Sequence, residues 1–346
     1  MEGLVDAGKR RVVVLYNTDY DQELIAAVDV SAVRESAQAI EQALRDYGFD
    51  STLIGVHGLD LGQVMDTLRE LMPDLVFNLC ESLNGDARNE IVVPSVLEML
   101  DLPYTGTGSL SLGLCLHKDR CKEILRARGI ATPDYRVLRT EQELEDPGLA
   151  GLDYPYFLKL AHEDASVGID ERNRVLDWQE LGVRARELMD GYRQPVIAER
   201  YIEGREVNVT VMGNDDDLTV LPLHEIDFAA MPAGRPHIVS YAAKWDEDHV
   251  DYEGTRPVPM RELTDALERA ITDVAQAAYR ALGLRDFGRV DLRIDPDGQP
   301  WVIDVNPNCD LSPDAGVARA AACADIAYPA LIGRVCELAW SRYGRS

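Results

Sequence analysis

The first hundred residues alternate between short apolar runs and segments whose apolar positions recur with a helical period. Apolar strands are expected at 10–16, 51–56 and 74–79, and helical patterns lie between them at 31–48 and 61–72. Alternation of buried strands with amphipathic helices predicts a Rossmann-like lobe built on a parallel sheet. The first strand ends in YNTDYD and carries no GxGxxG motif, so the pattern does not indicate dinucleotide binding.

The pattern changes near residue 107, where longer helices alternate with strands of an α+β unit. A helix containing HKDRCKEILRARG ends at Gly129, and the strands YPYFLKLA, RNRVLD and PVIAERYI follow. Two more strands, an irregular stretch at 228–258, a long helix, a hairpin and a terminal helix complete the chain. A connection as long as 228–258 is typically a lid or a disordered segment. We therefore expect three domains, at 1–106, 107–203 and 204–346.

The hairpin expected within GRVDLRIDPDGQPWVIDVNPN carries an unusual set of polar residues. Its central Asp-Gly dipeptide favours a two-residue type I′ turn. That turn would place Asp291 opposite Asp304 and Arg289 opposite Asn306, with all four side chains on one face. A three-residue loop or a bulge would change this register.

Two carboxylates facing each other across a strand pair should repel, because their Cβ atoms would lie only about 5 Å apart. A cation between them removes the repulsion, and converging oxygen ligands suit a hard ion such as Mg²⁺. A charged hairpin that simply faces solvent is the alternative.

Composition narrows the classes of partner. The chain has 61 acidic and 35 basic residues, a formal net charge of −26, which disfavours nucleic acid and anionic membranes. Six cysteines without CxxC spacing are expected to be reduced thiols of a cytoplasmic protein. The N-terminal sequence MEGLVDAGKRR does not read as a signal peptide, and no apolar run approaches membrane-spanning length.

Lysine is rare, occurring only at positions 9, 118, 122, 159 and 244, and the remaining basic residues are arginine. In LKLAHEDASVGI, Lys159 ends a strand and precedes a loop of small residues, which could let backbone N–H groups approach a phosphate. In PVIAERYIEGRE, two glutamates lie across a turn, where they could accept hydrogen bonds from a base and a ribose. Each segment is common on its own, and ordinary strand–helix turns are the alternative.

The order of these segments resembles the ATP-grasp superfamily, and more narrowly the D-alanine–D-alanine ligase family. The similarity runs from DLVFNL to the C-terminal region through EMLDLPYTGTGSLSLGLCLHKDRCK, FLKLAHEDASVGI, IAERYIEGREVNV, DFGRVDL and VIDVNPN. The resemblance implies an α/β fold of the ATP-grasp type. In that fold an N-terminal Rossmann-like lobe is followed by two α+β subdomains that clamp ATP.

The resemblance also assigns roles to individual positions. ATP phosphates would contact Lys118 and Lys159 beneath a loop formed by Asp164, Ala165, Ser166, Val167 and Gly168. Glu199 and the backbone of Tyr201 and Ile202 would bind the adenine, and Glu206 the ribose. Two Mg²⁺ ions, or Mn²⁺ in their place, would be held by Asp291, Asp304 and Asn306. Lys244 of the mobile loop and Arg289 would act in catalysis.

The implied reaction is ATP-dependent formation of an amide bond between small amino-acid-like substrates. ATP phosphorylates a carboxylate, an amine attacks the acyl phosphate, and ADP and phosphate are released. Arg289 would stabilise the oxyanion, and a closed lid would exclude water. The family also suggests a homodimer through the N-terminal lobe.

Departures from the family concentrate in substrate recognition. The family's N-terminal glutamate is absent, and the nearest acids are Asp19, Asp21, Glu23 and Asp29. Glu81 stands in place of a histidine-glycine loop, Trp245 replaces a tyrosine, and the serine-rich loop becomes PNCDLSPDAG. In that loop Asp310 and Asp314 would repel a substrate carboxylate, whereas Ser312 and the N–H groups near Gly316 could bind one. Asp304 also replaces a glutamate, which shortens its reach by one methylene.

These departures leave three hypotheses. One is synthesis of D-alanyl-D-alanine. A second, favoured by the altered pockets, is ligation of other amino acids or of an amino acid to a small secondary metabolite. The third is a nucleotide-binding protein that has lost catalysis, against which the retained Arg289 and the three phosphate lysines argue.

Overall fold

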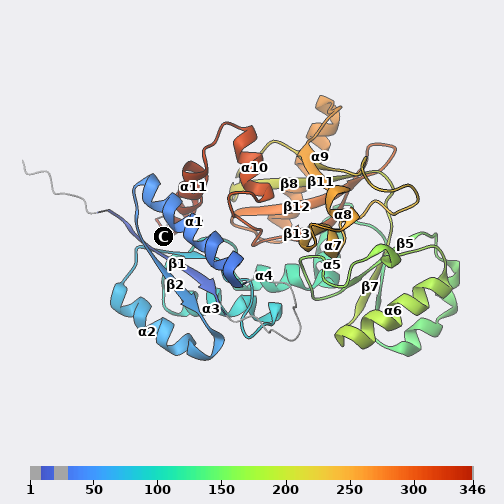
Figure 1. The fold of residues 1–346 in the computed structure, drawn as a ribbon, viewed down its shortest axis with the longest axis horizontal. Coiled ribbons are helices and arrows are strands. Elements are labelled where there is room, and N and C mark those ends of the chain that lie inside the picture. The colour runs from blue at the N-terminus through green and yellow to red at the C-terminus, as the bar shows by residue number, and fades with distance from the viewer. Residues whose placement is uncertain (1–8, 19–29, 345–346) are drawn as a thin grey trace, which may run out of the picture.

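The computed structural model describes residues 9–18 and 30–344. Its N-terminal lobe is a three-stranded parallel sheet in the order β2-β1-β3 (Figure 1). The strand β1 (Arg11–Asn17) is buried along almost its whole length, as its run of apolar residues requires. The other elements here are α1 (Val30–Tyr47), β2 (Asp50–Val56), α2 (Leu61–Leu71), β3 (Leu75–Asn78) and α3 (Val92–Met99).

The middle of the chain forms an antiparallel sheet in the order β4-β7-β5-β6, which packs against two short 3-10 helices, 141–145 and 147–151, and one α-helix (Figure 1). That helix, α6 (Trp178–Tyr192), begins where the Asp177 carboxylate accepts hydrogen bonds from the amides of Gln179 and Glu180. The strands are β4 (Tyr135–Leu138), β5 (Tyr156–Leu160), β6 (Arg174–Val175) and β7 (Val196–Arg200). Two helices, α4 (Ser109–Leu116) and α5 (Lys118–Ala127), connect this unit to the first lobe.

A second antiparallel sheet has the order β11-β10-β8-β12-β13, with β9 also paired to β8. Its central strand, β8 (Arg205–Asn214), pairs along its length with β12 (Asp286–Ile294). The amphipathic helix α9 (Asp265–Ala281) buries Ile271, Ala275 and Ala278 against this sheet. The remaining strands are β9 (Asp217–Val220), β10 (His224–Asp227), β11 (Arg256–Pro259) and β13 (Pro300–Asn306).

The C-terminal helix returns to the first lobe. α11 (Tyr328–Tyr343) packs on α1, and both contribute to one apolar core with β1 and β3 (Figure 1). The fully buried carboxylate of Asp286 accepts hydrogen bonds from Arg342 in α11 and from the Gly106 amide. This contact fixes the first lobe against β12, the strand that carries the hairpin residues.

The hairpin β12–β13 reaches the expected pairing by a different route. Asp291 lies opposite Asp304 and Arg289 opposite Asn306, as the sequence predicts. The expected two-residue turn is wrong, however: the Asp295 amide bonds the Gln299 carbonyl, which leaves a three-residue loop with Gly298 at φ +83°. A bulge at Ile303 then shifts the strand back by one residue. The two departures cancel at the four polar positions.

The segment 228–258 is less irregular than expected. It contains the short helices α7 (Tyr241–Trp245) and α8 (Val250–Glu253), and β11 begins within it. The buried carboxylate of Asp251 joins its two halves, because it pairs with Arg235 and accepts a hydrogen bond from Ser240. One further helix that the pattern did not indicate, α10 (Gly316–Cys323), follows the hairpin.

None of the six cysteines is paired in a disulfide. Within residues 9–18 and 30–344, no helix has both the length and the apolar character needed to cross a bilayer.

Candidate active site

Three separate segments meet at the side chain of Lys118, the first residue of α5. Its Nζ lies 2.8 Å from Oδ1 of Asp164, in the loop after β5, and 3.0 Å from Oδ1 of Asp304 in β13. Burial opposes the charge of this lysine, but the two carboxylates prevail and raise its pKa. In return Lys118, with Lys159 behind it, lowers the pKa of Asp304 against the effect of burial. The site therefore holds its charges as a compact ion cluster.

Glu199 lies behind this cluster, between two lysines. Its Oε2 is 2.7 Å from Nζ of Lys122 and its Oε1 is 3.1 Å from Nζ of Lys159. All three side chains are at most 8% exposed. Although burial raises the pKa of a carboxyl, the two ammonium groups lower the pKa of Glu199 overall. Lys159 also donates to the carbonyl of Ile303, the bulged residue of β13, at 2.8 Å.

Asp291 is the most tightly held carboxylate on the hairpin face. Arg289 donates to both of its oxygens, from Nε at 2.8 Å and from Nη2 at 3.0 Å. Asn208 of β8 and Asn306 of β13 donate to the same carboxylate at 2.7 and 3.0 Å. No protein hydrogen bond is made by Nη1 of Arg289 within the described residues, and the Asn306 amide keeps its oxygen for another ligand.

Glu206 is positioned by Arg293, which lies two residues beyond Asp291 on β12. The Arg293 Nη1 is 3.0 Å from the Glu206 carboxylate, and its Nε donates to the carbonyl of Ile202 at 2.9 Å. Its Nη2 donates to the hydroxyl of Tyr201 at 3.1 Å. One buried guanidinium therefore links the residues that the sequence assigns to base and ribose binding.

The small-residue loop after β5 lies against the lid formed by 228–258. Ser166 donates to the carbonyl of Val239 at 3.0 Å, and the Trp245 indole donates to the carbonyl of Ala165 at 3.3 Å. Gly168 has φ +73°, and a Cβ there would lie 3.2 to 3.3 Å from neighbouring side chains. Lys244 of α7 is exposed to solvent, yet desolvation by the surrounding chain, with repulsion from Arg289, lowers its pKa.

An acidic surface faces this cluster from the first lobe. Solvent reaches the Glu81 side chain, yet desolvation within the cleft, with repulsion from Asp310 and Asp164, raises its pKa to about 7. Burial also raises the pKa of Glu90, whose carboxylate accepts a hydrogen bond from Asn308 at 2.9 Å.

The loop after the hairpin holds the other two candidate substrate residues. The Ser312 amide donates to the Asp310 carboxylate at 2.8 Å, and the Ser312 hydroxyl bonds the same carboxylate. Gly316 begins α10, so the first amides of that helix have no partner within it.

The hairpin oxygens suit a hard divalent cation. Asp291, Asp304 and the free amide oxygen of Asn306 are oxygen donors on one strand pair, the ligand type that Mg²⁺ prefers. The surrounding lysines and Arg289 neutralise the charge of the carboxylates, and the same cations are suited to bind phosphate oxygens.

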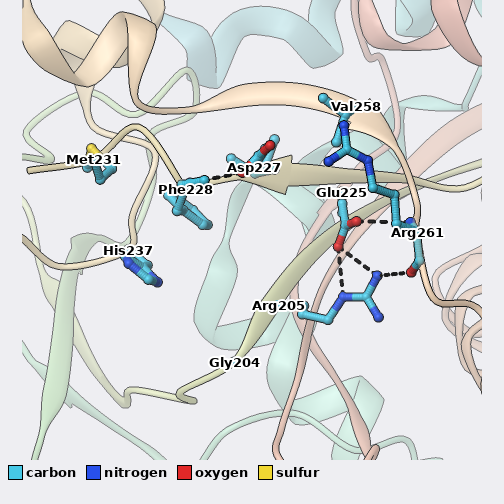
Figure 2. A pocket seen from close by; sticks show the side chains of 11 residues that line it. Gly204, Arg205, Glu225, Asp227, Phe228, Met231, His237, Val258 and Arg261 are labelled. Atoms are coloured by element: carbon cyan, nitrogen blue, oxygen red, sulfur yellow. Dashed lines mark hydrogen bonds and ion pairs between the residues drawn. The ribbon is translucent and has the colours of Figure 1, made fainter.

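A separate pocket of about 480 Å³ lies beside β10 and β11 (Figure 2). Arg205 donates to the Glu225 carboxylate at 2.7 Å, and the Arg261 amide donates to it at 3.0 Å. The Phe228 ring stacks on His237 with centroids 4.9 Å apart, and both residues belong to the lid. The lining includes none of the residues of the ion cluster, so this pocket is distinct from it.

The structure brings together nearly all of the side chains that the sequence singled out. Three contributors were missed, namely Lys122, Asn208 and Arg293. Lysine scarcity and strand alternation were signals for Lys122 and Arg293, whereas Asn208 depends on the pairing of β8 with β12. The candidate ammonium-binding acids Asp19, Asp21, Glu23 and Asp29 lie outside the described residues.

Two α+β units that bring carboxylates, lysines and a lid together are the arrangement of an ATP-grasp ligase, and comparison with known proteins shows this class. Residues 124–337 match the family described as "D-ala D-ala ligase C-terminus". The chain is 32% identical to a D-alanine–D-alanine ligase of Bordetella petrii over 304 residues, 88% of this chain and 85% of the relative. An uncharacterised Sinorhizobium fredii protein, y4sG, is 31% identical over 316 residues, 89% of this chain and 88% of the relative.

Solved structures show the same fold. A Bacillus anthracis D-alanine–D-alanine ligase complexed with ATP matches with a TM-score of 0.74 at 22% identity, covering 97% of this chain and 99% of that one. The VanG D-Ala:D-Ser ligase of Enterococcus faecalis matches with a TM-score of 0.72 at 19% identity, covering 96% and 99%. The chain belongs to the D-alanine–D-alanine ligase family. It is an ATP-dependent ligase that forms amide bonds, and a non-catalytic role is not favoured.

Proposed function

We propose that this ligase joins the carboxylate of one small amino-acid-type substrate to the amine of another, through an acyl phosphate, with release of ADP and phosphate. The observation that carries this proposal is the geometry of Arg289. Two of its nitrogens are fixed to Asp291 and the third has no protein partner among the described residues, beside carboxylates suited to Mg²⁺. A preorganised donor of this kind stabilises an oxyanion, an effect of about 3 kcal/mol.

The nucleotide would lie between the domains 107–203 and 204–346, under the lid. Lys118, Lys159 and the backbone of Asp164, Ala165, Ser166, Val167 and Gly168 are proposed to bind its phosphates. Glu199 with Tyr201 and Ile202 is assigned to the adenine, and Glu206 to the ribose. Arg293 supports this assignment, because it donates hydrogen bonds to Tyr201, Ile202 and Glu206 together.

We propose Asp291, Asp304 and Asn306 as ligands for Mg²⁺, which would neutralise charge on the transferring phosphoryl group. Lys118 now occupies both oxygens of Asp304, at 3.0 and 3.1 Å. On nucleotide binding its ammonium would turn toward the phosphates, and the carboxylate would become available. Lys244 would then face the γ-phosphate from the lid, which shields the acyl phosphate from water.

The acidic side chains of Glu81 and Asp310, called here the acidic wall, suggest where the amino substrate binds. Glu81 and Asp310 would face the substrate ammonium, and Trp245 would cover it from the lid. The free amides at Gly316 would donate to its carboxylate, while Ser312 orients Asp310. D-alanine is the substrate in the names of the ligase relatives, but these acids favour a different or more cationic amino acid here.

A screen of amino-acid pairs with ATP and Mg²⁺, read by phosphate release and product mass, tests this function. Arg289→Ala is expected to lose turnover yet retain nucleotide binding, whereas Arg269→Ala, at an exposed position of α9, should match the parent enzyme. Efficient turnover of D-alanine alone would contradict the altered substrate preference. Tight binding of Mg·ATP without phosphate release for any pair would contradict the ligase function itself.

The family resemblance further suggests a homodimer through the domain 1–106 in the cytoplasm. Light scattering coupled to gel filtration measures the mass directly, and a monomer at micromolar concentration would contradict the dimer.

A further inference from the structure

Two histidines and an aspartate form a cluster next to, but outside, the proposed nucleotide site. His117 lies between α4 and α5, Asp119 is in the first turn of α5, and His162 follows β5. One ligand atom from each lies within 4.8 Å of the other two. Across residues 9–18 and 30–344, this is the one group of three or more His, Cys, Asp or Glu side chains placed in this way.

The cluster is held by the fold rather than by bonds among its members. The amide of Lys118 donates to the carbonyl of Ala161 at 3.0 Å, which joins the start of α5 to the end of β5. The two imidazole rings lie with centroids 4.2 Å apart at an angle of 60°. Among the hydrogen bonds of the described residues, none involves a ring nitrogen of His117 or His162, although both side chains are partly buried.

The Asp119 carboxylate already accepts two hydrogen bonds but can accept more. Its Oδ1 accepts the Arg120 amide at 3.0 Å and its Oδ2 accepts Arg139 Nη2 at 3.0 Å. A carboxylate offers about four lone-pair positions, so each oxygen can accept one further partner. Asp119 is nearly buried, whereas the Arg139 side chain is 49% exposed and can move away.

We propose that His117, Asp119 and His162 bind a divalent transition metal ion of the Zn²⁺ class. Two imidazoles and one carboxylate are a common ligand set for Zn²⁺, Co²⁺ or Ni²⁺, with water completing the coordination. Tetrahedral coordination with bonds of about 2.0 to 2.2 Å separates ligand atoms by roughly 3.4 Å. Small side-chain rotations therefore close the cluster, because its atoms already lie within 4.8 Å.

The site is distinct in chemistry from the hairpin site. Asp291, Asp304 and Asn306 offer oxygen alone and suit Mg²⁺, whereas imidazole nitrogen favours the softer ions. His162 lies two residues before Asp164 in the chain. A metal ion bound to it and to Asp119 would therefore hold the start of the proposed phosphate-binding loop against α5. Bound metal should consequently raise the thermal stability of the chain, because it binds the folded state and not the unfolded one.

Titration of Co²⁺ into the full chain without a histidine tag tests the proposal directly. A large excess of Mg²⁺ keeps the hairpin site from contributing. We expect visible absorption bands of low-coordinate Co²⁺ at one equivalent, and a competing loss of these bands on adding Zn²⁺. His117→Gln and His162→Gln should each weaken Co²⁺ binding by more than about tenfold. His57→Gln and His249→Gln serve as matched controls and should not.

A second pair of variants tests the proposal while all three metal-binding side chains are kept. Arg139→Gln removes the cation that competes for Asp119 and should tighten Co²⁺ binding severalfold. Arg136→Gln removes an equal charge from an exposed position of β4, three residues before Arg139, and should have little effect. Equal tightening by both variants would show a merely electrostatic, unspecific attraction and would overturn the site.

Absorption by thiolate–Co²⁺ would also overturn it, because the exposed Cys323 lies 3.8 Å from His224 and could bind metal instead. If the histidine variants fold poorly, X-ray absorption of the Zn²⁺-loaded parent chain decides the matter. Two imidazole ligands without sulfur support the proposal, and fewer than two contradict it.

Discussion

Replacement of Glu199 by glutamine is the sharpest test of the buried charges that lie behind the ion cluster. The change keeps shape and removes the charge between Lys122 and Lys159. Their ammonium groups lie 2.7 and 3.1 Å from the carboxylate, and all three side chains are almost fully buried. The variant therefore contains two buried positive charges with no anion between them.

Breaking a buried ion pair by removing one partner typically costs about 3–5 kcal/mol. Each lysine keeps one hydrogen bond, Lys122 to Thr132 and Lys159 to the Ile303 carbonyl, both at 2.8 Å. These bonds orient the ammonium groups but do not neutralise them. We therefore expect Glu199→Gln to lower the free energy of unfolding by about 3–5 kcal/mol, measured by urea denaturation with tryptophan fluorescence and circular dichroism.

Adding Lys122→Met to this variant supplies the control. The double variant removes one of the two unpaired charges, so it should recover part of the loss, about 1–3 kcal/mol. The loss should also shrink at high pH. Burial already lowers the pKa of Lys122, and a buried lysine with a lowered pKa costs stability until rising pH deprotonates it. A Glu199→Gln variant whose free energy of unfolding lies within about 0.5 kcal/mol of the parent would refute the role given to the Glu199 carboxylate.

Three further predictions concern the glycine loop, the lid and the acidic wall. Gly168→Ala should cost about 1–3 kcal/mol in thermal unfolding, because its φ is +73° and a Cβ would crowd its neighbours, whereas Gly62→Ala, in open space in α2, should be neutral or stabilising. Lys244→Met should reduce kcat by about 10²–10³-fold with little change in ATP affinity, and an unchanged kcat would exclude it from catalysis. The pKa of Glu81 is raised to about 7, so its contribution to stability is complete below its usual range near 4.5 and is lost as pH rises through 7. The pH profile of kcat/KM should accordingly bend near 7 in the parent and lose that bend in Glu81→Gln.

The local pattern of apolar residues was sufficient to predict the strands and helices that bury a continuous apolar face of their own. The strand at β1 and the helix α9 follow directly from apolar runs and helical spacing. The helices α7 and α8 did not, because they depend on the buried pairing of Asp251 with Arg235 and Ser240 across the lid. Such contacts join residues more than ten positions apart, and no local propensity encodes them.

Among the active-site residues too, some could be predicted from the sequence, whereas others depend on contacts between distant segments. The resemblance of the ordered motifs to the ligase family, together with the scarcity of lysine, indicates Lys118, Lys159 and Lys244 from the amino-acid sequence. Lys122 was overlooked, since its partner Glu199 lies 77 residues later in the chain, on β7. Asn208 was overlooked for a similar reason, since only the β8–β12 ladder places it opposite Asp291. Partners on neighbouring strands become visible once register is known.

The bulge at Ile303 explains how the short side chain of Asp304 is placed. A bulge bends its strand and leaves one residue unpaired, and here the unpaired carbonyl is held by Lys159 at 2.8 Å. That lysine also binds Glu199, so residues assigned to the base and the phosphates are joined to the backbone of the strand that carries Asp304. The bulge offsets the shift made by the three-residue turn and directs Asp304 toward Lys118. The aspartate is therefore positioned by the backbone, and we expect this placement to offset the missing methylene in the metal site that we propose.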